Sequence, residues 1–141
     1  MLEIYVDGSC YGNPGPGGFG IAVYENKKLI KAYNKQFNKT TNNQMELLAI
    51  LSALALYGQE AETAKVYSDS AYAINTYTSW MFNWSANGWK KKDGNTPENL
   101  EIIKEYYYLL SLGYQIELIK VKGHSGIEEN EFVDKLAKGI L

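Results

Sequence analysis

Residues 42–57 constrain this chain most, because they have helical periodicity but no polar face. Apolar residues recur at helical spacing on one side, and others such as Leu47 make the remaining sides apolar too. A helix of this kind has no side suited to water, so we expect it to be largely buried. Thr41 or Asn42 can cap its start, and Gly58 can end it.

Patterns typical of strands surround this helix. Residues 2–7 alternate between apolar and polar, and residues 19–24 and 29–37 predict two more strands joined by a short polar turn, which favours antiparallel pairing. The glycine-rich stretch 8–18 predicts a turn-rich connection, which places Asp7 at the end of the first strand. Further along, the sequence predicts a strand at 65–68, a helix at 71–78, a helix from 96 to about 112 with Pro97 in its first turn, a strand at 115–121 and a closing helix at 128–140. This order indicates an α/β fold with a mixed sheet.

The composition excludes several functional classes. Fourteen basic residues, all lysine, and sixteen acidic residues give a net charge of −2. That balance argues against a polybasic nucleic-acid coat, and the lack of arginine argues against sequence-specific reading of the major groove. One cysteine rules out an intramolecular disulfide, and no apolar run has the length of a membrane span. We expect a single cytoplasmic domain over residues 1–141, with no membrane partner and a monomer as the default state.

Four carboxylates stand out by their positions. Glu46 is the only charge in the apolar helix, where an ionised group is costly unless it is paired or bound to a metal. It can also simply complement the helix dipole. Asp7 and Asp69 follow predicted strands, and Asp134 lies in the last helix. Each has an ordinary explanation as well: an Asp-Gly turn for Asp7, a helix N-cap for Asp69 and a solvated position for Asp134.

Together these carboxylates predict a cation site. Three of them lie where strands end or helices begin, and such ends line the ligand crevice of open α/β sheets. Each ionised pair at ~4–5 Å would repel by roughly 3–4 kcal/mol. Four converging carboxylates form six such pairs, so their summed repulsion would exceed the whole stability of a domain, ~5–15 kcal/mol. Protonation or bound cations must relieve this repulsion. Oxygen ligands favour Mg²⁺ or Mn²⁺ over zinc, and two such ions suit in-line attack on a phosphodiester.

Four ordered motifs resemble those of the type 1 ribonuclease H family, and the similarity covers nearly the whole chain. They are Asp7–Gly18, Asn42–Leu47, Tyr67–Ser70 and Val121–Gly126, the last followed by Glu129–Glu131 and Asp134. The resemblance implies a ribonuclease H-like fold, a five-stranded mixed sheet flanked by helices, with the second strand antiparallel to its neighbours. It also implies hydrolysis of the RNA strand of RNA–DNA hybrids with two Mg²⁺ ions, or Mn²⁺, which leaves 3′-hydroxyl and 5′-phosphate ends. Its metal ligands would be Asp7, Glu46, Asp69 and Asp134.

His124 is the only histidine, in a loop between Gly123 and Gly126 that is too flexible for a core position. By resemblance, it would assist proton transfer or product departure. We expect its loss to impair turnover rather than abolish it, because proton transfer usually contributes less than the metal ions do.

Recognition of a hybrid requires contacts with the 2′-hydroxyl, and short polar side chains beside the glycine-rich segment suit this task. By resemblance, Ser9, Asn13, Asn42, Asn43 and the backbone around Cys10 would contact the RNA strand, although turn chemistry alone also explains many of these residues. Gln44 stands where many members of the family carry arginine, so we expect weaker binding of the substrate at that point.

Residues 80–92 interleave three tryptophans with three lysines and contain no acid. Such a pattern suits a nucleic-acid platform, although a tryptophan-rich small core is the ordinary alternative, above all for Trp89. The segment resembles the family's basic protrusion, here at about residues 80–95. The corresponding residues for the DNA strand are Tyr72, Trp80, Trp84, Lys90, Lys91 and Lys92, with Thr41 and Asn99 at a DNA phosphate.

Two other functions remain open at this point. A DNA-directed nuclease or recombinase of the same fold would share the carboxylates but should lack the Asn42–Asn43 pair. A non-catalytic hybrid-binding module is disfavoured because the four carboxylates and His124 are all present.

Overall fold

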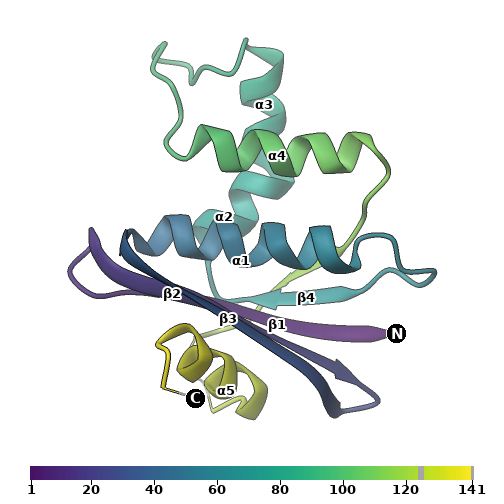
Figure 1. The fold of residues 1–141 in the computed structure, drawn as a ribbon. Helices are drawn as coiled ribbons and strands as arrows, with labels where there is room; N and C mark the ends of the chain where they lie inside the picture. Colours follow the sequence, from purple (N-terminus) through teal and green to yellow (C-terminus); the bar gives the residue numbers. More distant parts are fainter. Residues whose placement is uncertain (124–125, 141) are drawn as a thin grey trace.

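The computed structural model describes residues 1–123 and 126–140. Its strands are β1 (Leu2–Cys10), β2 (Gly15–Glu25), β3 (Lys28–Thr40), β4 (Lys65–Ser68) and β5 (Glu117–Lys120). They form one sheet in the order β3-β2-β1-β4-β5 (Figure 1). β2 runs antiparallel to both β1 and β3, whereas β4 runs parallel to β1 and β5. The predicted mixed sheet, with its second strand antiparallel to both neighbours, is therefore confirmed.

The first hairpin is longer than predicted. β1 continues to Cys10 and β2 already begins at Gly15, so the turn-rich connection is much shorter than residues 8–18. The glycines between them pair in an extended ladder, in which Gly8 faces Phe19. Asp7 therefore lies inside a strand, and both its predicted position at the strand end and an Asp-Gly turn there are wrong.

Two helical layers cover one face of the sheet, and a single helix covers the other (Figure 1). The apolar helix α1 (Asn42–Tyr57) lies on the sheet, and α4 (Leu100–Ser111) packs on α1. Helix α5 (Glu128–Ala137) packs against β1 and β2 on the opposite face. The main core lies between the sheet and α1, whose buried side chains include Met45, Leu47 and Ile50, as its lack of a polar face predicted.

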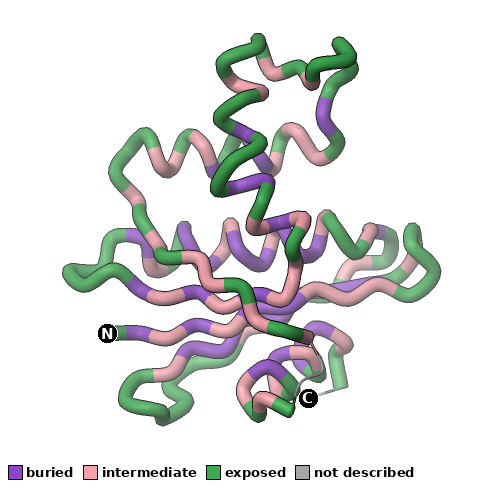
Figure 2. The backbone as a smooth tube through the Cα atoms, turned by 180° about the vertical axis from the view of Figure 1, so that it is seen from behind, coloured by how far each residue is buried: buried purple, intermediate pink, exposed green. Residues whose placement is uncertain are grey.

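The helical segment after β4 extends further than residues 71–78. It consists of α2 (Ala71–Asn75), the π-helical turn η1 (Thr76–Trp80) and α3 (Met81–Ala86). The segment projects away from the sheet, and exposed residues predominate at its far end (Figure 2).

Helix α4 starts later than the sequence predicts. Asn99 has a left-handed backbone, with φ 60°, so the helix can begin only at Leu100, and Pro97 lies before it rather than in its first turn. The closing strand and helix are also shorter than predicted, because β5 spans only Glu117–Lys120 and α5 ends at Ala137. No helix in residues 1–123 and 126–140 is long and apolar enough to cross a membrane.

Candidate active site

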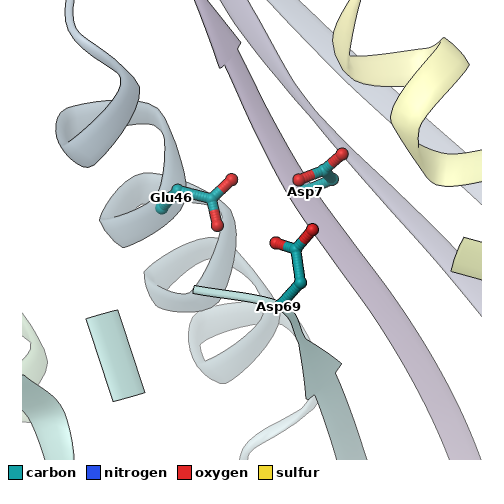
Figure 3. Close-up of side chains that lie close together, drawn as sticks. All are labelled: Asp7, Glu46 and Asp69. Atoms are coloured by element: carbon teal, nitrogen blue, oxygen red, sulfur yellow. The ribbon is translucent and has the colours of Figure 1, made fainter. Parts of the chain in front are cut away.

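Three of the four predicted carboxylates converge at one point. Asp7 comes from β1, Glu46 from the first turn of α1, and Asp69 from the residue that follows β4 (Figure 3). One oxygen from each of the three lies within 4.8 Å of the others. Asp7 and Glu46 are buried, and Asp69 is half-buried. The spacing is short enough for a single cation to be bound by all three.

The register of two parallel strands brings Asp7 and Asp69 together. Tyr5 of β1 pairs with Tyr67 of β4, and their rings stack with centroids 4.6 Å apart. Each aspartate lies two residues further along, so both stand level on the same face of the sheet. Asp69 is not the N-cap of α2, because the Ser70 hydroxyl accepts the capping hydrogen bond from the Ala73 N–H.

Glu46 is positioned by close contact between α1 and β1. A Cβ atom on Gly8 would lie 2.6 Å from the Glu46 backbone nitrogen, so only glycine permits this approach. The Gly8 N–H donates hydrogen bonds to Glu46 Oε1 and to Asp7 Oδ1. Glu46 Oε2 is buried and has no hydrogen-bond partner in the part of the chain that the structure describes. A buried carboxylate oxygen without a donor is costly, which makes it suited to a cation.

The electrostatics of the cluster favour an added cation as well. Burial, together with the charge of Asp69, raises the pKa of Asp7 to about 7. Burial also raises the pKa of Glu46 well above its usual value, helped by the charge of Asp7. Both shifts have the same two causes, burial first and then repulsion between the neighbouring carboxylates, and a bound cation would offset both.

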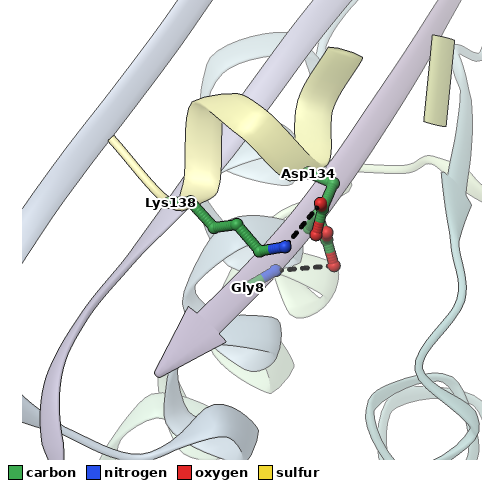
Figure 4. A network of polar contacts seen from close by, with 4 residues as sticks. Gly8, Asp134 and Lys138 are labelled. Carbon is green, nitrogen blue, oxygen red and sulfur yellow. Dashed lines mark hydrogen bonds and ion pairs between the residues drawn. The ribbon is translucent and has the colours of Figure 1, made fainter. Parts of the chain in front are cut away.

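Asp134 completes the pocket from the opposite side of the sheet. It belongs to α5, which approaches β2 so closely that a Cβ atom on Gly20 would lie 2.6 Å from Leu136 Cβ. Asp134 Oδ2 lies 3.0 Å from the Lys138 Nζ atom, one turn later, and the pair lies beside Gly8 (Figure 4). This contact raises the pKa of Lys138. The cavity, of about 400 Å³, is lined by Asp7, Gly8, Ser9, Asn42, Glu46, Asp69, Ser70, Asp134 and Lys138.

The predicted RNA-strand residues divide into two groups. Ser9 and Asn42 line the carboxylate pocket itself. Asn13 accepts a hydrogen bond from the Asn42 N–H at 2.8 Å, so its side chain fixes the β1–β2 turn to the start of α1. The Cys10 thiol points to the carbonyls of Gly15 and Thr40. Asn43 is exposed outside the set that lines the pocket.

The residue before Met45 also has a structural partner. Thr41 is the N-cap of α1 and accepts a hydrogen bond from the Gln44 N–H, which confirms one of the two predicted caps. The Gln44 side chain bonds to the Thr40 hydroxyl at 2.7 Å. Gln44 therefore ties the end of β3 to the first turn of α1.

A second cavity, of about 480 Å³, gathers the predicted DNA-strand aromatics. It is lined by Tyr72, Trp80, Trp84, Lys91, Pro97 and Glu98. Ring centroids are 6.2 Å apart between Tyr72 and Trp80 and again between Trp80 and Trp84. We call these three side chains the aromatic row. Asn99 reaches its first member through an amide contact of 3.4 Å with the Tyr72 hydroxyl.

The lysines of the protrusion are not equivalent. Lys91 is half-buried in this cavity, whereas Lys90 donates a hydrogen bond to Thr96 at 2.8 Å and Lys92 is exposed. Trp89 packs against the main core and makes an edge contact with Tyr107 at 5.2 Å. The interpretation of Trp89 as a core residue is therefore supported.

Some of the residues that line the two cavities were not predicted from the sequence, and one predicted site residue lies outside the residues that the structure describes. Lys138 was signalled only by its spacing of four residues from Asp134, and Ser70 only by its place beside Asp69. Nothing in the sequence indicated Glu98, which follows a proline in a loop. His124 lies outside the described residues. Gly123 does approach the site, since a Cβ atom there would lie 2.6 Å from Asp69 Oδ2.

Comparisons with known proteins give a consistent result. The family model for RNase H matches residues 1–141. Ribonuclease HI from Haemophilus ducreyi is 43% identical over 140 residues, which cover 97% of this chain and 88% of that protein. The crystal structure of LC9-RNase H1, described as a type 1 RNase H with the type 2 active-site motif, is 31% identical, has a TM-score of 0.82 and is matched over 98% of this chain and 70% of that one. LC11-RNase H1, solved with an RNA/DNA hybrid, shares the fold at 20% identity and a TM-score of 0.72, over 99% and 95% of the two chains.

Proposed function

The chain belongs to the ribonuclease H family of nucleases, and from this premise we propose that it hydrolyses the RNA strand of RNA–DNA hybrids with two divalent metal ions. The convergence of three carboxylate oxygens within 4.8 Å carries the proposal. The hybrid found in the LC11-RNase H1 structure supports the choice of substrate.

The residues of the pocket fit divalent metal ions. The donors are all carboxylates, which suits Mg²⁺ or Mn²⁺, and the buried Glu46 Oε2 has no partner in the described chain. The ions, when bound, would supply an activated water and stabilise the departing 3′-oxygen, so that the products carry 3′-hydroxyl and 5′-phosphate ends. We assign His124 a part in proton transfer near the scissile phosphate. The proposed ligands are Asp7, Glu46, Asp69 and Asp134.

Lys138 gives the pocket a positive charge of its own. Its ammonium group lies 3.0 Å from Asp134 and partly neutralises the acidic cluster. Asp134 must exchange this contact, at least in part, for any ion that it binds. The pair is partly exposed and contributes little stability, so Asp134 can give up this contact at small cost when an ion binds.

Selection of the RNA strand rests on the groups that share the carboxylate pocket. Ser9 and Asn42 line it, so a ribose whose phosphate reaches the carboxylates would pass their side chains. The 2′-hydroxyl both donates and accepts hydrogen bonds, and these residues offer a hydroxyl and an amide. We propose that they distinguish ribose from deoxyribose, with Asn13, Asn43 and the Cys10 backbone as further contacts of the RNA strand.

The DNA strand is assigned to the aromatic row. Flat rings suit sugars and bases, and Lys91 beside them suits a phosphate. Asn99 contacts Tyr72, so a phosphate that it holds would lie next to this cavity. Thr41, Lys90 and Lys92 complete the proposed phosphate contacts.

One assay tests the proposal against its alternatives. The protein is incubated with Mg²⁺ and end-labelled RNA–DNA, DNA–DNA and RNA–RNA duplexes of the same sequence, with the Asp7→Asn variant as the control. We expect cleavage of the RNA strand of the hybrid alone, with 3′ ends that a DNA polymerase can extend. Cleavage of DNA would indicate a DNA-directed nuclease, and binding without cleavage would indicate a hybrid-binding module. Either result would overturn the proposal.

A further inference from the structure

The spacing of the aromatic row along the chain does not match the period of a regular α-helix. Tyr72 and Trp80 line the same cavity and lie 6.2 Å apart between ring centroids, yet they are eight positions apart in the chain. Eight residues of a regular α-helix turn through about 800°, which would rotate Trp80 by roughly 80° away from Tyr72. Trp84, four residues beyond Trp80, would turn away with it. A regular helix would therefore divide the row.

The π-helical turn η1 resolves the mismatch. The Met81 N–H bonds to the Thr76 carbonyl, five residues earlier rather than four. A π turn accommodates one additional residue without advancing the helix phase, so the eight-residue step behaves like a seven-residue step. Seven residues turn through about 700°, which brings Trp80 back to within roughly 20° of Tyr72.

We infer that η1 is a positioning element that aligns Trp80 and Trp84 with Tyr72, and that Thr76 and Thr78 fix it between the rings. The inference rests on the proposed function, because alignment of the three rings matters for activity only if they bind a nucleic-acid strand. The position of the π turn matters as much as its presence. A π turn located after Trp80 would realign Trp84 and leave Trp80 rotated out of the row.

Two threonine hydroxyls hold the turn in place. Thr76 donates from its hydroxyl to the Tyr72 carbonyl at 2.7 Å, and Thr78 donates to the Ile74 carbonyl at 2.6 Å. Such bonds to the preceding turn of a helix favour local departures from regular geometry. Thr76 is fully buried, so its hydroxyl has no competing water. Both acceptor carbonyls belong to α2, the helix that carries Tyr72.

Tyr77 connects the same turn to α1, the helix that carries Glu46, and to α4. Its hydroxyl donates a hydrogen bond to the Leu47 carbonyl of α1 at 2.9 Å, and its ring stacks on Tyr106 of α4 at 3.7 Å. Leu47 follows Glu46 directly, so η1 is tied to the helix that carries a proposed metal ligand. The aromatic row is thereby held at a fixed position relative to the carboxylate pocket.

The test replaces the two hydroxyls without changing side-chain shape. In the Thr76→Val, Thr78→Val variant we expect KM for a hybrid to rise about tenfold while kcat stays within about twofold, because base stacking contributes to binding and the carboxylates are untouched. The near-UV circular dichroism of the tryptophans should change. Ser111→Ala is the matched control, since it removes a similar bond, from Ser111 to the Tyr108 carbonyl in α4, far from the row.

Deletion of Ser79 provides the decisive comparison. The deletion removes the extra residue, so a regular helix would keep Tyr72 and Trp80 seven positions apart and aligned. In the double-valine background it should restore KM to near the wild-type value. An unchanged KM in the double-valine variant, or no rescue by the deletion, would overturn the inference. If the double-valine protein does not fold, hybrid binding by the deletion variant alone decides, because loss of binding in a folded protein contradicts the phase argument.

These outcomes separate the inference from the proposed function. If the wild-type protein fails to bind and cleave the hybrid, the proposed function is wrong whatever the variants do. The circular dichroism still reports whether the threonines keep the tryptophans in their wild-type arrangement, and an unchanged spectrum in the double-valine variant would count against the inference.

Discussion

Gly8 and Glu46 are in direct contact: the Gly8 N–H donates a hydrogen bond to Glu46 Oε1, and a Cβ atom on Gly8 would lie 2.7 Å from the Met45 carbonyl carbon. The contact sets the distance between β1 and α1, and through it the distance between Asp7 and Glu46. The proposed metal site therefore depends on a residue that carries no side chain.

Replacement of Gly8 by alanine should separate β1 from α1. Backbone atoms of α1 stand in the way of the added methyl group, so we expect a loss of roughly 1–3 kcal/mol in the free energy of unfolding, measured with urea. Cleavage should fall by more than tenfold, because the carboxylates no longer meet. Ser9→Ala, at the next position of the same strand, is the control for stability and should cost less than about 0.5 kcal/mol. Equal stability of the two variants would contradict the role of Gly8.

The raised pKa of Asp7 predicts how the metal-free protein responds to pH. The folded protein holds this proton up to about pH 7, whereas the unfolded chain releases it near its ordinary value of 3.8. The folded state therefore binds more protons between these values, and its stability should fall as pH rises from about 4 to 7, by up to about 4 kcal/mol from this group. Glu46 acts in the same direction.

Thermal unfolding in EDTA and in Mg²⁺ checks this prediction. Mg²⁺ should raise Tm more at pH 8 than at pH 5, because ionised carboxylates bind the ion and protonated ones do not. The Asp7→Asn variant is the control: it should be more stable than the wild type in EDTA at pH 8 and gain less from Mg²⁺. The same Tm increase at both pH values would be evidence against a metal site at these carboxylates.

Sequence reasoning located the carboxylates but not their geometry. Glu46 was recognisable because a single charge in an apolar helix is conspicuous, and Asp69 because it follows a short strand. The strand that carries Asp7 was too short in the prediction, since Gly8 and the glycines after it suggested turns, whereas in the structure Gly8 permits close packing of α1 on the sheet, as Gly20 of β2 does for α5. Local sequence patterns cannot reveal such contacts, because the partners lie far apart in the chain.

The helical segment shows a second limit of sequence reasoning. The sequence predicted a helix over residues 71–78, within which Thr76 and Thr78 have modest helix propensity. In the structure, their hydroxyls bond to the preceding turn and the helix continues through a π turn. The late start of α4 shows the same limit. Asn99 adopts a left-handed backbone, which would have been easier to predict at a glycine.

Asp7 and His124 should differ in how completely their loss stops the reaction. Asp7→Asn keeps the size of the side chain but removes a proposed metal ligand, so cleavage of the hybrid should become undetectable. His124→Ala removes a proton-transfer group and should leave a residue of activity, lowered by about 10²–10⁴-fold. Single-turnover cleavage with excess enzyme measures both. Equal residual activity in the two variants would contradict this ranking of their roles.

The lysines of the protrusion should contribute unequally to hybrid binding. Replacement of Lys90, Lys91 and Lys92 by alanine removes three positive charges, so the slope of log affinity against log salt should become shallower by about 2 to 3. Lys91 lines the cavity of the aromatic row, whereas Lys90 is bonded to Thr96, so Lys91→Ala alone should weaken binding more than Lys90→Ala or Lys92→Ala. Fluorescence titration of a labelled hybrid at several salt concentrations measures these slopes. Lys65→Ala, in β4, is the control for a lysine outside this cavity, and a triple variant that keeps the wild-type slope would show that the protrusion does not bind the hybrid.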